Sequence, residues 1–547
     1  MEDNLKDKIL AFNFKQWFAK ERLVIIFLTL LVFAVYLNAL GNGFVSDDID
    51  GILQNPDLNN FSSFFSSPLK LLRSFYPILS AVIVQIFGKI PLPFHFLNII
   101  FHLGTVIAIF LLVCLISDRT AAFFTAALVA CHPIMTEAVT WISGGGHVMY
   151  SFFIILGLLF YILAVRKEKF LYLSLIASIL ALSSSEKAII FPLLIIILAL
   201  SLKIKPTNLK KLAILLIPAV LTCLLFITLI PARLSVLQNG FDQIRITLNP
   251  LVQIPVAISS YLQLIFWPKD LTFYHSEISF SRPKFLIYSA VFILFLAAML
   301  FSWKKNKRLF FWLSFFLVSL LPTLTPLGIS WIVAERYVYL GAIGIFATVG
   351  LIFSRAVQKA KNPKIVYIAF AVIIMALSWR TIVRNNDWKN QDTFWQATAK
   401  TSPQSWQNHK NLGDLYGQRG DSEKAIEEFK KAIELNPGYA DAFNDLGNVY
   451  QQMGKMDLAI KSYQKAIALN PTLWQPCLNL AAIYSQQNET GLTNNYLEKA
   501  LGINPKNAAF YFRLGIIYSQ LKEKEKAIAE FQKALELDPE IGAQFQK

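Results

Sequence analysis

Two adjacent carboxylates, Asp47 and Asp48, follow the first long apolar segment of the chain. A carboxylate in this position can accept the proton of a hydroxyl group while the hydroxyl oxygen attacks, which is general-base catalysis. An unpaired charge beside hydrocarbon is costly, so the pair needs a function, a partner or water. Both aspartates are therefore candidate catalytic residues. A solvated acidic loop is the alternative, and spacing alone does not say which aspartate would be the base.

Other ionisable residues stand near the predicted ends of apolar segments on the same side of the membrane. Charges so close to hydrocarbon are rare unless they pair or line a polar cavity. Arginine suits an anionic phosphate because its guanidinium is planar, always charged and bidentate, whereas lysine adds a point charge. Snorkelling to the interface is the structural alternative for each residue taken singly. The candidate substrate-binding residues are Arg73, Glu137, His147, Glu186, Lys187, Arg233, Arg245, Glu335 and Arg336.

The histidines of the hydrophobic region do not suggest a metal site. They stand at positions 95, 102, 132, 147 and 275, without the spacing of a ligand set. We therefore expect no bound metal and no other cofactor, although spacing does not exclude metal dependence. The sequence also lacks a prominent glycine-rich phosphate loop, which disfavours a soluble nucleotide donor.

These residues depend for their positions on apolar segments that can cross a bilayer. Hydrophobic residues make up 55% of the 547 positions and the mean hydropathy is +0.49, as in polytopic membrane proteins. Segments 76–87 and 251–267 are apolar but short or interrupted, so they could lie along the interface or enter it part-way. Eleven spans are predicted, at 23–40, 94–116, 121–140, 148–165, 170–182, 188–202, 212–230, 285–303, 309–325, 332–353 and 365–379.

Basic residues are distributed unevenly among the loops. Residues 1–384 contain 33 Lys and Arg against 16 Asp and Glu, a net charge of +17, whereas residues 385–547 contain 18 against 19. With a cytoplasmic N-terminus, the short inside segments hold 21 of the 33 basic residues and the longer outside segments hold 12. This is the positive-inside bias, and an odd number of spans then puts Asp47, Asp48 and the C-terminal region outside the cytoplasm. Because the basic residues lie between apolar segments, we expect no nucleic-acid partner.

The C-terminal region contains an internal repeat. Prolines recur every 34 residues, at positions 403, 437, 471, 505 and 539, with Leu-Gly, Tyr and Ala at matching places in three repeats and a looser match, Leu480-Ala481 and Tyr484, in the third of the four. This period and pattern predict tetratricopeptide (TPR) repeats, whose helix pairs stack into a superhelix with a concave groove. Such a groove binds an extended peptide or a partner protein; a spacer or an oligomerisation surface is the alternative. A half-repeat at 392–400, with Phe394 and Trp395, is expected to cap the array.

The predicted fold class is therefore all-α. Residues 1–384 form a polytopic membrane helix bundle of about 11 spans, and residues 385–547 form a TPR α-solenoid with a half-repeat and four repeats.

Several motifs resemble those of the transmembrane and TPR-repeat-containing O-mannosyltransferase family, which is related to the dolichyl-phosphate-mannose protein mannosyltransferases. They are FVSDD at 44–48 with ILQNPD at 52–57, HPIMTEAVTWI at 132–142, SEKA at 185–188 and ERYVYL at 335–340, followed by the repeats. One segment departs from the pattern: Gly144-Gly145-Gly146-His147 stands where many members have Gly-Arg and an acidic residue. His147 could substitute there in contacting the donor.

The resemblance implies a GT-C glycosyltransferase fold with its site on the lumenal or periplasmic face. It implies a polyprenyl- or dolichyl-phosphate-linked sugar as donor, usually mannose, a Ser or Thr hydroxyl of an exported protein as acceptor, and inversion at the anomeric carbon. By the same resemblance Asp47 is preferred as the base, with Asp48 orienting the base or the acceptor. The arginines and Lys187 would then face the leaving phosphate, Glu137 and Glu186 would hold sugar hydroxyls or those cations, and Glu335 would set the rotamer of Arg336.

Two other functions remain open from the sequence. An O-antigen-ligase-like or oligosaccharide-transferring enzyme would use a late outer loop, for which Arg233, Arg245 and His275 are available. A non-enzymatic TPR membrane scaffold is the third possibility. The membrane would be the plasma membrane with periplasmic or extracytoplasmic repeats in a bacterium, or the endoplasmic reticulum with lumenal repeats in a eukaryote. In either enzyme the partners are membrane lipid, a lipid-linked donor and an acceptor protein or peptide in the TPR groove.

Overall fold

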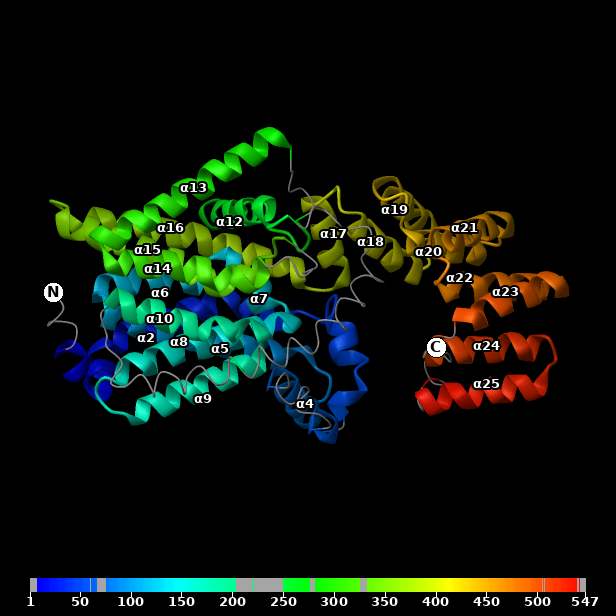
Figure 1. Cartoon of the computed structure of the whole chain (residues 1–547), viewed down its shortest axis with the longest axis horizontal. Helices are drawn as coiled ribbons and strands as arrows, with labels where there is room; N and C mark the ends of the chain where they lie inside the picture. The colour runs from blue at the N-terminus through cyan, green and yellow to red at the C-terminus, as the bar shows by residue number, and fades with distance from the viewer. Residues whose placement is uncertain are drawn as a thin grey trace. The chain divides into compact units, whose positions relative to one another are not determined.

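The structure is a computed structural model that describes residues 7–59, 61–65, 75–202, 220, 249–275, 281–324, 332–503, 505, 507–538 and 541. All regular elements within these ranges are helices, as predicted (Figure 1). The chain forms two compact units, residues 1–397 and 398–547. This boundary lies 13 residues after the one drawn from the sequence at 384.

The first unit is a bundle of helices that run side by side (Figure 1). Its described helices include α2 (Phe14–Tyr36), α4 (Phe75–Phe87), α5 (Pro91–Ile116), α6 (Arg119–Cys131), α7 (Thr136–Thr140), α8 (Gly145–Leu163), α9 (Lys169–Ser184), α10 (Phe191–Leu202), α12 (Pro250–Phe266), α13 (Arg282–Lys305), α14 (Lys307–Leu320), α15 (Glu335–Lys359) and α16 (Pro363–Asn385).

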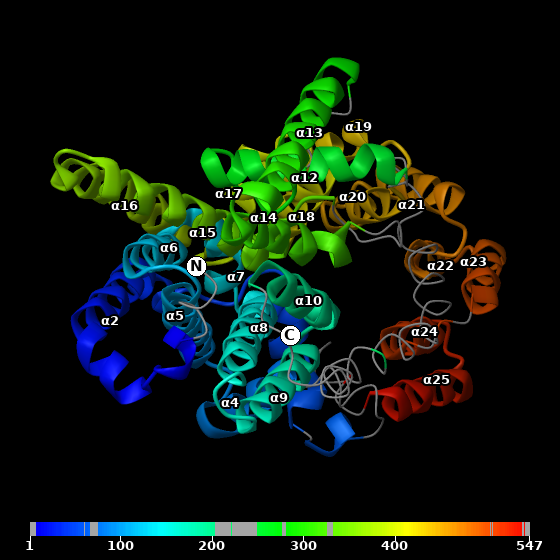
Figure 2. The ribbon, with the colours of Figure 1, turned by 60° about the vertical axis from the view of Figure 1, so that its left-hand side comes forward.

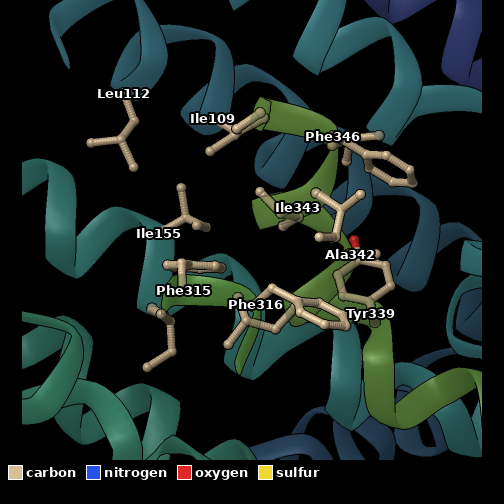
Figure 3. Packing of buried hydrophobic residues seen from close by; sticks show 14 of the residues in the cluster. Ile109, Leu112, Ile155, Phe315, Phe316, Tyr339, Ala342, Ile343 and Phe346 are labelled. Atoms are coloured by element: carbon tan, nitrogen blue, oxygen red, sulfur yellow. The ribbon is translucent and has the colours of Figure 1, made fainter. Parts of the chain in front are cut away.

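The centre of this bundle is the α15 helix. It packs against α6 and α14 along much of its length, while α5 packs against both α6 and α8. Figure 3 shows side chains of α5, α8, α14 and α15 meeting in the core, among them Ile109, Ile155, Phe315 and Ile343. Burial of each such side chain contributes about 1.5–3 kcal/mol.

Glycines allow the closest of these helix approaches. A Cβ built on Gly344 of α15 would lie 2.5 Å from the Trp312 carbonyl oxygen and 2.9 Å from the Phe316 nitrogen of α14. One built on Gly350 would lie 2.7 Å from the Ala121 carbonyl oxygen of α6. Small residues let helix backbones approach in this way within membranes.

Six described helices are long and apolar enough to cross a membrane, or seven if the bent pair α6–α7 counts as one span. The predicted spans at 170–182, 188–202 and 309–325 correspond to described helices of 16, 12 and 14 residues. These are shorter than the 18 residues required of a candidate membrane-spanning helix. The predicted span at 212–230 lies outside the described residues. The two interrupted segments form α4, of 13 residues, and α12, of 17 residues.

Two peripheral helices expose apolar side chains, as a lipid-facing surface requires. Leu286, Leu294 and Phe301 of α13 are more than 60% exposed, as are Ile365 and Trp379 of α16. Together with the long apolar helices, these faces identify the first unit as that of a multi-pass membrane protein.

The span predicted at 121–140 is broken at His132. Helices α6 and α7 are bent by 54° there, just before Pro133. A break frees backbone groups that need new partners in a membrane. The Thr381 hydroxyl of α16 donates to the Cys131 carbonyl at 2.6 Å, and His132 Nε2 lies 2.9 Å from the Ile265 carbonyl at the end of α12.

The second unit is a stack of four helix pairs with the predicted repeat. Its helices are α18 (Trp406–Gln418), α19 (Ser422–Leu435), α20 (Ala440–Gln452), α21 (Met456–Leu469), α22 (Trp474–Gln486), α23 (Thr490–Ile503), α24 (Ala508–Gln520) and α25 (Lys524–Leu537). The recurring glycine lets the two helices of a pair approach: a Cβ on Gly447 would lie 2.6 Å from the Tyr463 ring.

The segment expected to cap the repeats is helical, and its residues up to 397 belong to the first unit. Phe394 and Trp395 lie on α17 (Gln391–Thr401), and the Phe394 ring centroid is 5.1 Å from that of Phe273 and 4.9 Å from that of Trp388. Trp395 stacks on Tyr274 at 6.3 Å. The first turns of α17 therefore belong to the membrane unit.

The closest helix approach in the core can be tested by adding one methyl group. We expect Gly344→Ala to destabilise the protein by about 1–3 kcal/mol, because the methyl would meet backbone atoms that cannot rotate away. Gly41→Ala is the control, since a Cβ there meets nothing within 4 Å. Thermal unfolding in detergent measures both, and equal melting temperatures would contradict the packing described.

Candidate active site

The two aspartates of the first loop have different environments. Asp48 is fully buried, whereas Asp47 is exposed. Ser46, just before them, has a φ of +54°, in the left-handed region that non-glycine residues seldom adopt and that is frequent at functional sites. The first carboxylate, Asp47, is thus left in solvent, and the next, Asp48, is turned inward.

Asp48 fastens the first loop to the segment between α7 and α8. Its Oδ1 accepts hydrogen bonds from the Ser143 backbone N–H at 2.8 Å and from the Ser143 hydroxyl, and its Oδ2 accepts from the Val45 N–H at 3.1 Å. Burial raises the pKa of Asp48 to about 6, against the lowering effect of these hydrogen bonds. A carboxylate with three such partners is suited to positioning its neighbours.

A buried ion pair joins α7 to the first turn of α15. Glu137 is fully buried; its Oε2 accepts from the backbone N–H of Arg336 at 2.9 Å, and its Oε1 pairs with the Arg336 guanidinium. The first N–H groups of a helix lack partners within the helix, so Glu137 caps α15 from another element. Asp47 also interacts electrostatically with Arg336, which places the exposed carboxylate near this cation.

Aromatic rings surround the Arg336 guanidinium. Its Cζ lies 5.0 Å from the ring centroid of Tyr337, 5.2 Å from that of Phe273 and 5.4 Å from that of Trp141. Cation–π contacts of this kind are worth about 0.5–2 kcal/mol each and restrict the guanidinium to one place. Arg336 is therefore a fixed positive charge and not a mobile surface residue.

Tyr337 connects Arg336 to two further predicted residues. The Lys187 ammonium lies 4.0 Å from the Tyr337 ring centroid, and the His147 ring lies 6.0 Å from it. Lys187 and Glu186 belong to the short 3₁₀ helix Glu186–Ile190 between α9 and α10. His147 lies in the first turns of α8, and its Nδ1 is buried without a hydrogen-bond partner among the described residues. The structure thus gathers Asp47, Glu137, His147, Lys187 and Arg336.

Glu335 faces away from the arginine beside it in sequence. Its Oε1 lies 3.5 Å from Arg384 Nη2 and 3.7 Å from His275 Nε2, and Arg384 also pairs with Asp387 at 2.8 Å. Glu335 and Arg384 are both buried. Glu335 was expected to set the rotamer of Arg336; in the structure Glu137 makes the contact that orients Arg336.

Three candidate residues, Arg73, Arg233 and Arg245, lie outside the described residues. Across the described ranges, no group of three or more His, Cys, Asp or Glu side chains is arranged to hold a metal ion.

The sequence reasoning missed several residues of this region. Arg384 was overlooked although it stands at the end of the last predicted span, as the other candidates stand at the ends of theirs. Ser143 and Phe273 carry no charge and gave no signal of their own, and Trp141 appeared only as part of the motif at 132–142. Only their contacts with Arg336 and Asp48 show that they build the site.

Comparison with known protein families identifies the repeats of the second unit. The family model described as "TPR repeat" matches residues 413–454, and "Tetratricopeptide repeat" matches 440–473 and 508–541. A solved structure titled "Crystal structure of MamA" is 27% identical, covering 27% of this chain and 87% of that one, with a TM-score of 0.23. Fold and repeats together define a multi-pass helical membrane protein that carries a TPR array.

Curated relatives extend across both units. "Protein O-mannosyl-transferase TMTC3" of Mus musculus is 24% identical over 79% of this chain and 52% of the relative. The Homo sapiens protein of that name is 24% identical over 74% and 51%, and "Protein O-mannosyl-transferase F38B6.6" of Caenorhabditis elegans is 23% identical over 74% and 61%. The resemblance drawn from the motifs is thereby confirmed: the chain is similar to the TMTC protein O-mannosyl-transferases. It spans about half the length of these relatives.

The Glu137–Arg336 pair can be tested by a double-mutant cycle. Glu137→Gln or Arg336→Gln alone leaves a buried charge without its partner, so we expect each to cost about 3–5 kcal/mol. The double variant should lose clearly less than the sum of the two. Thermal unfolding measures the cycle, with exposed Arg355→Gln on the same helix as a neutral control. Strict additivity would show that the two side chains do not interact.

The raised pKa of Asp48 predicts a pH dependence of stability. Its pKa is about 6 in the folded protein and about 3.8 when unfolded, so the folded state binds the proton more tightly. The contribution of this residue is therefore greatest below pH 4 and is lost as the pH rises to 6, by about 3 kcal/mol in all. Asp48→Asn should flatten the change in melting temperature between pH 4 and 7, whereas exposed Asp50→Asn should not. Parallel curves for wild type and Asp48→Asn would contradict the assignment.

Proposed function

We propose that this protein is an integral-membrane glycosyltransferase. It moves a sugar, mannose by similarity to the TMTC relatives, from a polyprenyl-phosphate donor to Ser or Thr hydroxyls of exported proteins. The observation that supports this most is the division between the two aspartates: the Asp48 carboxylate accepts three hydrogen bonds, while Asp47 is exposed and within electrostatic range of a fixed arginine. A general base needs an accessible carboxylate, and a leaving phosphate needs a fixed cation.

The residues of the site divide the proposed reaction among them. Asp47 takes the proton of the acceptor hydroxyl as the hydroxyl oxygen bonds to the anomeric carbon of the sugar. The bond between that carbon and the phosphate oxygen breaks, and the lipid phosphate leaves as an anion. Arg336 and Lys187 face that anion, since arginine and lysine both bind phosphate oxygens strongly. Asp48, through Ser143, keeps the loop that carries the base in place.

Further predicted residues support this arrangement. Glu137 orients Arg336, and its carboxylate is already committed to that cation. His147 has a buried ring nitrogen that no other described residue contacts by a hydrogen bond, so it can contact the donor in the segment where the family pattern departs. Glu186, partly exposed beside Lys187, can hold a sugar hydroxyl.

The location proposed for the protein follows from its charge pattern. The basic ends of the spans face the cytoplasm, so the acidic loop and the repeats lie on the periplasmic or lumenal side. The TPR array would there hold the acceptor protein. A donor with a polyprenyl tail fits this layout, because the tail remains in the bilayer while the sugar is presented at its surface.

The role of Asp47 is tested by transfer to a Ser/Thr peptide from a lipid-phosphate mannose donor, with hexose gain followed by mass spectrometry. We expect Asp47→Asn to lower the rate by about 10²–10⁴, because the base is lost. Asp50→Asn, exposed in the same loop, should retain the rate. His275→Ala should also retain transfer, whereas an O-antigen-ligase-like enzyme would lose it.

The same proposal has a consequence in cells. Exported proteins should carry hexose on Ser or Thr when this gene is present and lose it when the gene is deleted. Unchanged spectra in both cells, or undiminished transfer by Asp47→Asn, would contradict the proposal.

A further inference from the structure

The end of α16 and the residues that follow it contact several parts of the candidate site. We call residues 384–391 the junction segment; it comprises the last two residues of α16, the short 3₁₀ helix Asn386–Trp388 and the chain as far as the first residue of α17. Within the first unit, α16 packs beside α2, α6 and α15 (Figure 2). The contacts of the junction segment are therefore set by the fold and not by nearness in sequence.

The junction segment holds the loop that carries Asp47. The Gly43 N–H donates to the Lys389 carbonyl at 2.8 Å. Asn42, which is buried, donates from its Nδ2 to the Asn385 carbonyl at 3.0 Å, although 343 residues separate the two. The chain is thus fixed just before the exposed carboxylate.

The same segment contacts the two helices that carry the buried ion pair. The Thr140 hydroxyl, at the end of α7, donates to Asn385 Oδ1 at 2.8 Å. Arg384 Nη2 lies 3.5 Å from Oε1 of Glu335, the residue next to Arg336 in the first turn of α15. One short stretch of chain therefore contacts the first loop, α7 and α15.

Asn385 is the residue at which most of these contacts meet. It is fully buried, and its Nδ2 donates to the Val35 carbonyl at 2.9 Å and to Asn38 Oδ1 at 2.8 Å. Its Oδ1 accepts from Thr140, and its backbone carbonyl accepts from Asn42. An asparagine amide has two donor hydrogens, so both are used here. A buried network whose polar groups are satisfied is rigid and specifies one arrangement of the elements that it joins.

The reaction proposed above requires Asp47 and Arg336 to stand at a fixed separation. The base lies on the first loop and the cation lies on α15, so their separation depends on how those elements are joined. Just after the base, Asp48 is fixed by its hydrogen bonds with Ser143. Just before it, the junction segment fixes the chain. A misplacement of about 1 Å by a change far from the chemistry can lower a rate by about 10².

We propose that the junction segment positions the catalytic base, with Asn385 as the positioning residue that sets Asp47 against Arg336. Asn385 makes and breaks no bond in the reaction. It acts by joining the start of the first loop to the end of α7, whose Glu137 orients the cation. This inference rests on the proposed function, because it gives Asn385 a part in that reaction.

The inference is tested on the full-length protein in detergent, by hexose transfer from a lipid-phosphate mannose donor to a Ser/Thr peptide. We expect Asn385→Ala to lower kcat by about 10–10², with the KM of both substrates nearly unchanged. Thr140→Val removes one hydroxyl and should lower kcat by a smaller factor, about fivefold, the effect of one net hydrogen bond. Thr140→Ser keeps that hydroxyl and should restore most of the rate.

The matched control is Ser354→Ala. Ser354 is buried near the other end of α15, and its hydroxyl donates to Asp118 Oδ1 at 2.8 Å. This variant loses one buried hydroxyl hydrogen bond, as Thr140→Val does, but far from Arg336, so it should transfer hexose as the wild type does. Equal kcat for Ser354→Ala and both junction variants would overturn the inference.

The Asp47→Asn background separates positioning from a loss of folded protein. If Asn385 acts through the base, Asn385→Ala should lower the residual rate of Asp47→Asn by less than twofold, because no base remains to be positioned. Partial unfolding would lower the rate by the same factor in both backgrounds, and that result would overturn the inference. Thr140→Val carries the same comparison if Asn385→Ala does not fold.

Amide hydrogen exchange followed by mass spectrometry tests the contact without activity. Peptides that cover residues 42–48 should exchange faster in Asn385→Ala than in the wild type, because the hold on the loop is lost, and should not change in Ser354→Ala. Normal transfer by the wild type, with unchanged exchange and kcat in the junction variants, would overturn this inference alone. Absence of transfer by the wild type from any lipid-linked donor would instead overturn the proposed function, and with it the catalytic role of Asn385.

Discussion

The arrangement of the membrane unit depends on the buried ion pair between Glu137 and Arg336. A lone charge in this place would be costly, and each partner removes that cost for the other. Glu137 also accepts the Arg336 backbone N–H, so one carboxylate fixes both the side chain and the start of α15. The pair therefore fixes α7 relative to the central helix α15. The residues that contact Arg336 are arranged around this fixed point.

Around this pair the site is built in layers. Trp141, Phe273 and Tyr337 enclose the guanidinium, and Tyr337 in turn contacts Lys187 and His147. Phe273 also packs on Phe394, so the aromatic residues that enclose the cation continue into the first turns of α17. The polar network of Glu335 with Arg384 lies next to this cluster and shares its burial. Fixed charges in a water-poor setting act more strongly on a charged group than they would in water.

Much of the fold was predictable because it is periodic or strongly apolar. The interval of 34 residues defined the repeats, and α5, α8 and α15 follow long apolar runs. The shorter helices α9, α10 and α14 were predicted with roughly the right bounds, but hydropathy does not state where a helix bends or stops. The contacts of the 392–400 segment could not be predicted, because Phe394 and Trp395 have partners in a distant loop. The two aspartates could not be told apart for the same reason: Ser143, which donates hydrogen bonds to Asp48, is 95 residues away.

The break between α6 and α7 bears on how the chain is made. The carbonyl oxygen of Cys131 receives its hydrogen bond from Thr381, 250 residues later in the chain. Synthesis runs from the N-terminus, so the ribosome has released the kinked segment long before its partner exists. Until the last span inserts, that carbonyl must find water, a lipid headgroup or a temporary helical bond. The final shape of this segment is thus completed only after α16 has been made and inserted, and a chain that stopped before Thr381 would lack the means to hold it.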